Sequence, residues 1–256
     1  MAISLLASIS LAACGGGGES EAPQVEQPAA STNQYKEGFM PAGFSSVNDF
    51  GTLQIDQDYF NYLLVNRGQS AVGSAGVTVS TTNSLAPVLC IRPTGNKVVI
   101  DRMSFAKGGT TQWTLRSDGP ATVDWFVFDA GRPTLDVGPG ISVYDASGRL
   151  AYNSNASEMR IKSIVTTPAD PETTSMRGDV IQAVPAGVAA CIASPKARFQ
   201  YVGVPAPLPL FVEGVQFEGS NIRVGYVQTG TGPILDETYL LNDGVTQIIL
   251  IDITGL

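Results

Sequence analysis

The chain has 256 residues, with 23 acidic residues, 15 Lys or Arg residues and no histidine, and its formal net charge is −8 at pH 7. It contains no block of basic residues, so nothing in it favours nucleic acid as a partner. Without histidine, Ser-His-Asp and Cys-His nucleophile pairs and histidine-ligated zinc or iron sites are excluded. We therefore expect a non-enzymatic protein with no catalytic residue, metal site or cofactor.

Residues 1–14 form a short apolar segment that ends in Leu-Ala-Ala-Cys, and four glycines follow Cys14. This segment is too short to cross a bilayer as a helix of the mature protein. The small residue before the cysteine and the polar tether after it match the lipobox of bacterial lipoproteins. Cys14 is therefore a candidate lipidation site, and an unprocessed N-terminus is the alternative. Several acyl chains on Cys14 would hold the protein on a membrane.

Residues 15–38 are rich in Gly, Glu, Pro, Ala and Ser. Such a segment buries too little apolar surface to offset the entropy lost on ordering, so we predict a flexible linker. Roughly 220 residues remain after it, enough for one large or two small β domains.

From residue 44 onward, apolar and polar residues alternate, and Gly, Asn, Asp and Pro interrupt the pattern frequently. Alternation with a period of two is typical of half-buried strands, whereas no long segment repeats apolar residues at helical spacing. We predict an all-β fold of one or two β-sandwich domains. Trp113 and Trp125 lie in strongly alternating segments, so we expect them to fill the core, with stacking on a sugar as the alternative.

Two stretches, 47–56 and 143–154, share one hairpin pattern: a strand, an aspartate, a glycine turn and a returning strand that begins with leucine. An aspartate side chain can hydrogen-bond the backbone of a turn, and glycine tolerates the positive φ that the turn requires. We expect these roles for Asp49, Gly51, Asp145 and Gly148.

The repeated hairpin suggests two related β units. We predict a first β domain over 39–135 and a second over 136–256, with the boundary near residues 131–140.

Three features stand out toward the C-terminus. Residues 215–226 predict a hairpin that turns at Gly219-Ser220-Asn221, and a last hairpin is expected to turn at residues 242–244 before a central apolar strand. The prolines of 204–214 favour an edge strand, an intersubunit arm or a loop, because proline cannot donate to a strand ladder.

Cys90 and Cys191 each lie in a short apolar run that ends at a proline. A free cysteine behaves as a small buried hydrophobe, so we expect two buried thiols. The alternative is a disulfide formed in an oxidising compartment, which requires a close approach of the two Cα atoms.

Several carboxylates could carry chemistry. Asp124 and Asp129 could form a glycosidase pair, but such a pair must converge across a cleft. Asp56, Asp58 and Asp101 lack the spacing of a calcium-binding EF-hand. We interpret these three as strand-face carboxylates in contact with solvent.

The stretch 43–68 resembles the opening of a group of small β-rich proteins from tailed bacteriophages, which are tail, tail-tip or minor tail proteins. Those proteins carry an N-D-x-G-x-x-Q-I-D hairpin followed by Y-x-N-x-x-L, and later a second hairpin of the type V-Y-D-A-S-G-x-L. The residues that match are Asn48, Asp49, Gly51, Gln54, Ile55, Asp56, Tyr59, Asn61 and Leu64 in the first pattern, and Tyr144, Asp145, Ala146, Ser147, Gly148, Leu150 and Ser154 in the second.

The resemblance implies a structural component of a phage tail tip or baseplate, located in the virion. Such a protein would assemble with other tail proteins as a symmetric oligomer and contact the host surface. The lipobox-like extension departs from the family and supports an alternative. In that alternative the chain is a bacterial or prophage-encoded surface lipoprotein, anchored in a membrane through Cys14, whose body acts as a binding module.

Overall fold

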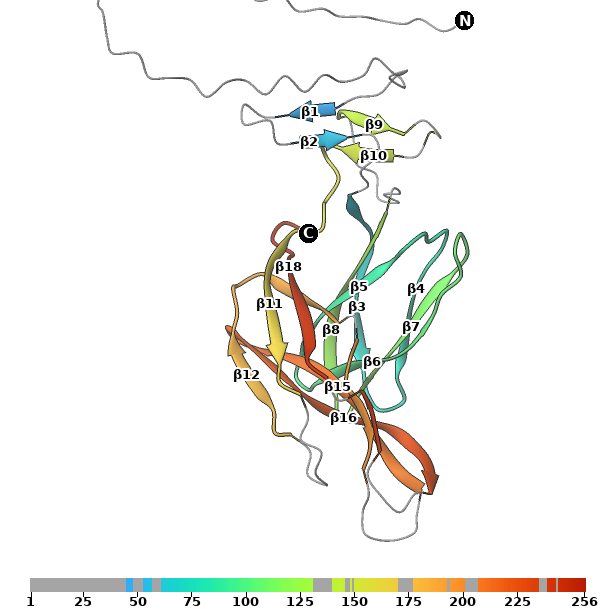
Figure 1. Ribbon diagram of the computed structural model, residues 1–256, viewed down its shortest axis with the longest axis vertical. Coiled ribbons are helices and arrows are strands. Elements are labelled where there is room, and N and C mark those ends of the chain that lie inside the picture. The colour runs from blue at the N-terminus through green and yellow to red at the C-terminus, as the bar shows by residue number, and fades with distance from the viewer. Residues whose placement is uncertain are drawn as a thin grey trace, which may run out of the picture. The chain divides into compact units, whose positions relative to one another are not determined.

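The computed structural model describes residues 45–47, 53–56, 61–130, 140–145, 148, 150–169, 177–192, 194–200, 207–234, 239–242 and 244–256. Every regular element among them is a β-strand (Figure 1), which confirms the all-β prediction. No helix in this part of the chain is long and apolar enough to span a membrane. The predicted apolar segment with Cys14 and the predicted linker 15–38 lie outside the described residues, as do Asp49 and Gly51.

Two antiparallel sheets make up most of the described chain. The first has six strands, in the order β11 (Ile161–Thr167), β18 (Thr246–Asp252), β13 (Val188–Ile192), β5 (Val88–Thr94), β8 (Ala121–Ala130) and β3 (Tyr62–Val72). We call it the six-stranded sheet.

The second sheet has eight strands. Its main path runs β12 (Val180–Ala183), β16 (Asn221–Ile234), β15 (Pro207–Glu218), β6 (Val98–Ser104), β7 (Thr111–Ser117) and β4 (Val77–Thr81), while β14 (Ala197–Phe199) pairs with β15 and with β17 (Tyr239–Asn242). We call it the eight-stranded sheet.

The main core lies between these two sheets, as in a β-sandwich. Strands of both sheets contribute alternate side chains to it, for example Leu89 and Ile91 from β5, and Trp113 and Leu115 from β7. The core position expected for Trp113 is therefore confirmed. Trp125 is partly buried against the same core, and its indole Nε1 donates a hydrogen bond to Ser70 Oγ at 3.1 Å.

The stretches predicted as separate β domains, 39–135 and 136–256, contribute strands to both sheets. In the six-stranded sheet, β13 of the second stretch pairs with β5 of the first, and β18 pairs with β13. In the eight-stranded sheet, β15 of the second stretch pairs with β6 of the first. Residues 41–256 form one compact unit. The predicted division therefore does not separate two independent cores, because the inward faces of both stretches pack in the same cluster.

Both repeated hairpins form. β1 (Ser45–Val47) pairs antiparallel with β2 (Leu53–Asp56), and β9 (Ser142–Tyr144) pairs antiparallel with β10 (Leu150–Asn153). In the second turn Gly148 has a φ of 75°, and its backbone N–H donates to the carbonyl of Asp145 at 2.9 Å. The positive φ expected at Gly148 is therefore confirmed.

The C-terminal hairpins differ in part from expectation. β15 and β16 form a hairpin in which Glu218 faces Asn221, so the turn is Gly219-Ser220 and one residue shorter than predicted. β15 is an interior strand and not an edge, because it pairs with β16 on one side and with β14 and β6 on the other. The last predicted hairpin is wrong: β17 pairs with β14 in the eight-stranded sheet, whereas β18 lies in the six-stranded sheet.

The six-stranded sheet is also apolar on its other face. A second cluster there contains Leu64, Cys90, Phe126, Phe128, Ala189, Cys191 and Ile251, with Met159, Ile253 and Leu256 packed against it. Because both faces are covered, all five residues of β13 are buried. This explains why the sequence of β13 is apolar throughout and does not alternate.

Candidate functional site

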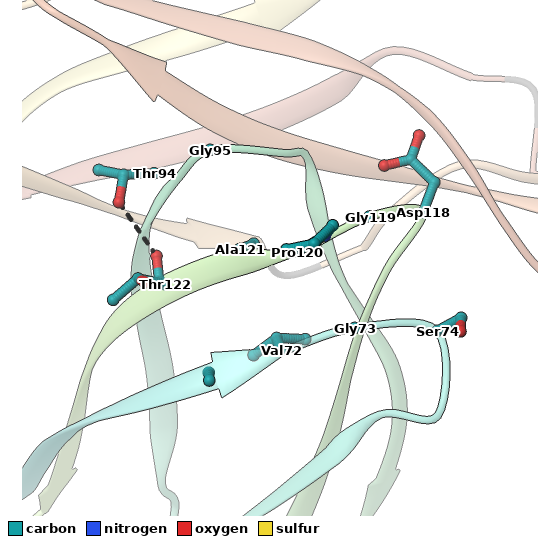
Figure 2. A pocket seen from close by; sticks show the side chains of 11 residues that line it. Val72, Gly73, Ser74, Thr94, Gly95, Asp118, Gly119, Pro120, Ala121 and Thr122 are labelled. Carbon is teal, nitrogen blue, oxygen red and sulfur yellow. Dashed lines mark hydrogen bonds between the residues drawn. The ribbon is translucent and has the colours of Figure 1, made fainter.

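One end of the sandwich carries a hollow among three turns (Figure 2). It has a volume of about 660 Å³ and is lined by Gly73 and Ser74 after β3, Gly95 after β5, and the Asp118-Gly119-Pro120 turn between β7 and β8. We call it the loop hollow. Asp118, on the turn, is the only charged residue among its described lining.

Polar groups around the loop hollow bond mainly to one another. Thr94 Oγ1 donates to the carbonyl of Thr122 at 3.4 Å, and Asn96 Nδ2 donates to the carbonyl of Pro120 at 2.7 Å. These bonds brace neighbouring turns, and Ser74, Asp118 and Thr122 supply the other polar side chains of the lining. Because its apolar side chains are limited to Val72, Pro120 and two alanines, the loop hollow lacks the extensive apolar walls that are typical of small-molecule sites.

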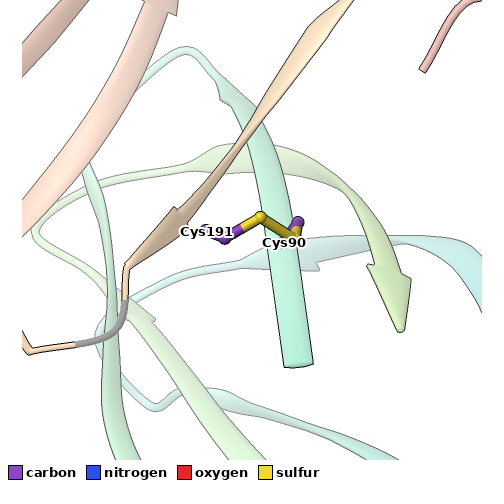
Figure 3. Close-up of a disulfide and its surroundings, with 2 residues drawn as sticks. All are labelled: Cys90 and Cys191. Atoms are coloured by element: carbon purple, nitrogen blue, oxygen red, sulfur yellow. A yellow bond between two sulfur atoms is a disulfide. The ribbon is translucent and has the colours of Figure 1, made fainter. Parts of the chain in front are cut away.

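Cys90 and Cys191 form a disulfide (Figure 3). The two residues are direct cross-strand partners in β5 and β13, and their Cα atoms are 4.1 Å apart. The expectation of two free thiols is therefore wrong, and the disulfide alternative is the one that the structure has. Opposed side chains on one face of an antiparallel pair are close enough for such a link.

The disulfide is buried in the second apolar cluster. Cys90 is 0% exposed and Cys191 is 3% exposed, and Phe126 and Phe128 lie in the same cluster. The bond joins residues 101 positions apart in the chain. Little of either cysteine is accessible to solvent, so we assign the bond a structural role.

A second cavity lies where the eight-stranded sheet splits. It has a volume of about 370 Å³, and we call it the apolar pocket. Most of its walls are apolar side chains from both sheets. Its described lining consists of Pro87, Val88, Leu89, Ile100, Asp101, Arg102, Met103, Trp113, Met159, Cys191, Ile192, Pro195 and Ile249.

The pairing of β6 explains why this pocket exists. β6 pairs with β15 only where Val98 faces Val215, since β15 pairs farther along with β14 through Leu210, Phe211 and Val212. The register of β6 against β7 also shifts between Ile100 and Arg102. Such a bulge bends the strand and re-aims its side chains. Past Val98, β6 continues to pair with β7, and its residues from Ile100 to Met103 line the pocket.

Two charged residues, Asp101 and Arg102, line the apolar pocket, and Arg116 pairs with Asp101. The Asp101 side chain is only 8% exposed, and its Oδ2 is 3.1 Å from Arg116 Nε and 3.7 Å from Arg102 Nε. Arg116 is fixed further by a hydrogen bond from Nη1 to the carbonyl of Thr229 at 3.1 Å. The Arg102 side chain, in contrast, is 80% exposed. The expectation that Asp101 is a strand-face carboxylate in contact with solvent is therefore wrong, because the Asp101 side chain is nearly buried and pairs with Arg116.

The candidate glycosidase pair does not converge. Asp129 is buried and accepts hydrogen bonds from the backbone N–H groups of Leu85, Ala86 and Ala130 at 2.9, 2.7 and 2.8 Å. Asp124 accepts from Gln69 Nε2 at 2.7 Å. Five residues along one extended strand separate them by about 16 Å at about 3.3 Å per residue, which exceeds the spacing that the chemistry needs.

A buried polar cluster escaped the sequence analysis. Glu213 of β15 is 1% exposed, and its Oε1 accepts hydrogen bonds from Arg177 Nη2 at 2.6 Å and Thr167 Oγ1 at 3.1 Å. Lys196 is also buried and donates to Thr167 Oγ1 at 3.1 Å and to the carbonyl of Pro168. A charged residue within the apolar run of β15 is the only sequence signal that pointed to it. Its contacts join β11, β15 and the segment before β14.

Asp252, at the end of β18, has a strongly shifted titration. The backbone N–H of Thr254 donates to Asp252 Oδ1 at 3.0 Å, and Lys162 Nζ lies 3.0 Å from Oδ2. The hydrogen bonds from Thr254, and then the contact with Lys162, lower the pKa of Asp252 to about 2. The contacts of the folded chain therefore favour the ionised form of the Asp252 carboxyl group.

No family model, curated protein or solved structure matches the chain. Among the described cavities, the apolar pocket best meets the physical requirements of a ligand site, because apolar walls from two sheets surround it and an exposed cation lies beside it.

Proposed function

We propose that the chain is a disulfide-bonded protein of the bacterial cell envelope, anchored in a membrane through Cys14, whose β-sandwich acts as a binding module. The observation that carries this proposal is the buried Cys90–Cys191 disulfide. Disulfides form and persist outside the cytosol, where no thiol pool keeps cysteines reduced.

The lipobox-like sequence at residues 11–14 supports the same location. Lipid attachment to Cys14 and oxidation of the two body cysteines both require export of the chain. One route across the inner membrane would account for both features, although they lie far apart in the sequence. The apolar pocket supplies the binding surface that such a module requires.

A tail-tip or baseplate protein of a bacteriophage is the second candidate. The formation of the β1–β2 and β9–β10 hairpins fits the residues on which that resemblance rests. Tail proteins assemble inside the host cell, where the reducing cytosol disfavours a disulfide. The Cys90–Cys191 bond therefore favours the envelope protein over the tail protein.

The test is the state of the three cysteines in cells. The full chain would be expressed in a bacterium that processes lipoproteins, labelled with radioactive palmitate, and its thiols blocked with a maleimide in denaturant before and after reduction. We expect label in the wild type, no label in Cys14→Ser, and maleimide on Cys90 and Cys191 only after reduction. Maleimide on both cysteines without reduction would overturn the proposal.

A parallel measurement addresses the tail candidate. Peptides from residues 43–256 at a fixed copy number in density-banded virions, together with reduced cysteines, would favour the tail protein. Their absence from banded virions would exclude it.

A further inference from the structure

We propose that the apolar pocket binds an amphipathic carboxylate, with the apolar part of the ligand inside the pocket and its carboxylate at Arg102. This inference deepens the proposed function by naming the ligand class of the binding module.

The walls of the pocket suit an apolar molecule. Its volume of about 370 Å³ lies within the range typical of small-molecule sites. Leu89, Ile192 and Trp113 are part of its lining, and all three are buried members of the main core. An apolar ligand placed against them would remove both its own surface and theirs from water.

The charges at the pocket favour an anionic group on that ligand. Arg116 approaches the Asp101 carboxylate more closely than Arg102 does, and it holds a fixed position through Thr229. Asp101 is thus neutralised by Arg116. The guanidinium of Arg102 is then left as a solvent-facing positive charge beside an apolar cavity. A planar guanidinium matches a carboxylate with two parallel hydrogen bonds.

The side chains flanking the pocket also point to a ligand. Met103 follows Arg102 on β6, lines the pocket, and is 52% exposed. A large apolar side chain beside a cavity loses its contact with water when a ligand covers it. Methionine is unbranched and flexible, so it can adapt to an acyl or aryl group of variable shape.

The experiment uses decanoate as the probe and the purified, oxidised full chain. The protein has two tryptophans, and Trp125→Phe leaves Trp113 in the pocket wall as the only indole fluorophore. We expect decanoate, kept below its micelle concentration, to change the Trp113 emission saturably. Decanol, which has the same chain without the charge, is expected to bind more weakly.

Two variants in this background test the assigned roles. Arg102→Gln is expected to raise the Kd for decanoate about tenfold, the size of one charge-assisted hydrogen bond, and to leave the Kd for decanol unchanged. Met103→Glu places a carboxylate beside the pocket and is expected to weaken decanoate further. Both positions are exposed, so the fold should tolerate the substitutions, and circular dichroism would verify this.

Ile181→Glu provides the matched control, since Ile181 is 57% exposed on β12 and does not line the pocket. It should bind decanoate like the parent. The inference fails if decanoate gives no saturable signal, if Arg102→Gln weakens decanol as much as decanoate, or if Ile181→Glu weakens decanoate as much as Met103→Glu.

This outcome is separable from that of the proposed function. Binding is measured on purified protein, whereas the envelope location is measured by lipid and thiol labelling in cells. Decanoate binding by a protein whose cysteines stay reduced in cells would sustain the ligand assignment and reject the envelope location.

Discussion

Glu213 places a carboxylate in the interior of the fold, where Arg177 and Thr167 hydrogen-bond one of its oxygens and Lys196 Nζ lies 3.9 Å from the same atom. Removing one partner of a buried ion pair leaves desolvated charge behind, which costs about 3–5 kcal/mol. We expect Glu213→Ala to lower the free energy of unfolding by about this amount in urea titrations.

Glu218 provides the control for Glu213, because it lies on the same strand, pairs with Arg223 at 3.1 Å and has a side chain that is 45% exposed. Exposed ion pairs contribute about 0–1 kcal/mol, so Glu218→Ala should be nearly neutral. Equal losses for the two variants would contradict the structural role assigned to the buried cluster.

The pKa of Asp252 predicts a defined acid response. Its folded-state pKa of about 2 lies below the ordinary value of 3.8. The carboxylate therefore stabilises the fold above about pH 4, and this contribution is lost as the pH falls toward 2. We expect wild type to exceed Asp252→Asn in stability at pH 5 and the difference to shrink toward pH 2, as urea titrations at each pH would measure.

Lys162→Met separates the two sources of this effect. The Thr254 backbone hydrogen bond is the largest cause of the lowered pKa, and Lys162 is a smaller one. Lys162→Met should therefore keep most of the pH dependence that Asp252→Asn loses. A flat stability difference between pH 5 and pH 2 for Asp252→Asn would show that the Asp252 charge does not stabilise the fold.

At the scale of elements, the alternation of apolar and polar residues predicted those strands that have one face in the core and the other toward solvent. The alternation in β7 places Trp113 and Leu115 inward, and the glycine-containing turn joins β15 to β16 as a hairpin. The similar turn sequence at residues 242–244 gave a wrong prediction of a hairpin. A turn sequence does not specify which sheet each flanking strand joins. There the chain passes from β17 in one sheet to β18 in the other.

The apolar pocket could not be predicted from the sequence for a related reason. It arises from a register shift in β6 and from the competition of β14 and β6 for the same edge of β15. Register and strand order are properties of long-range pairing, which alternation alone does not encode. In the sequence alone, Asp101 and Arg102 are therefore indistinguishable from ordinary charged residues on a strand face. Only the strand pairing shows that they line a cavity.

At the scale of the whole molecule, the interleaving of strands from both halves of the chain determines how the disulfide acts. Cys90 and Cys191 face one another only because β13 lies beside β5 in the six-stranded sheet, a neighbour relation between strands about a hundred residues apart. The sequence showed two similar apolar runs but not their adjacency, which is why burial was predicted for both cysteines and their pairing was not.

The large sequence separation of Cys90 and Cys191 also determines how much the disulfide adds to the free energy of unfolding. Cross-linking residues 101 positions apart restricts the unfolded chain, and the chain-entropy model gives about 4.7 kcal/mol for a loop of about 100 residues. We expect the double variant Cys90→Ala, Cys191→Ala to lose about 4–5 kcal/mol of unfolding free energy in urea titrations.

Reduced wild type is the control. Wild type that is reduced in denaturant and measured with reductant present loses the cross-link but keeps both sulfur atoms in the apolar cluster, so it separates the effect of cross-linking from that of packing. If the restriction of the unfolded state dominates, reduced wild type and the double variant will unfold at similar urea concentrations. A reduced wild type as stable as the oxidised protein would instead mean that the sheet pairing alone holds the two halves of the chain together.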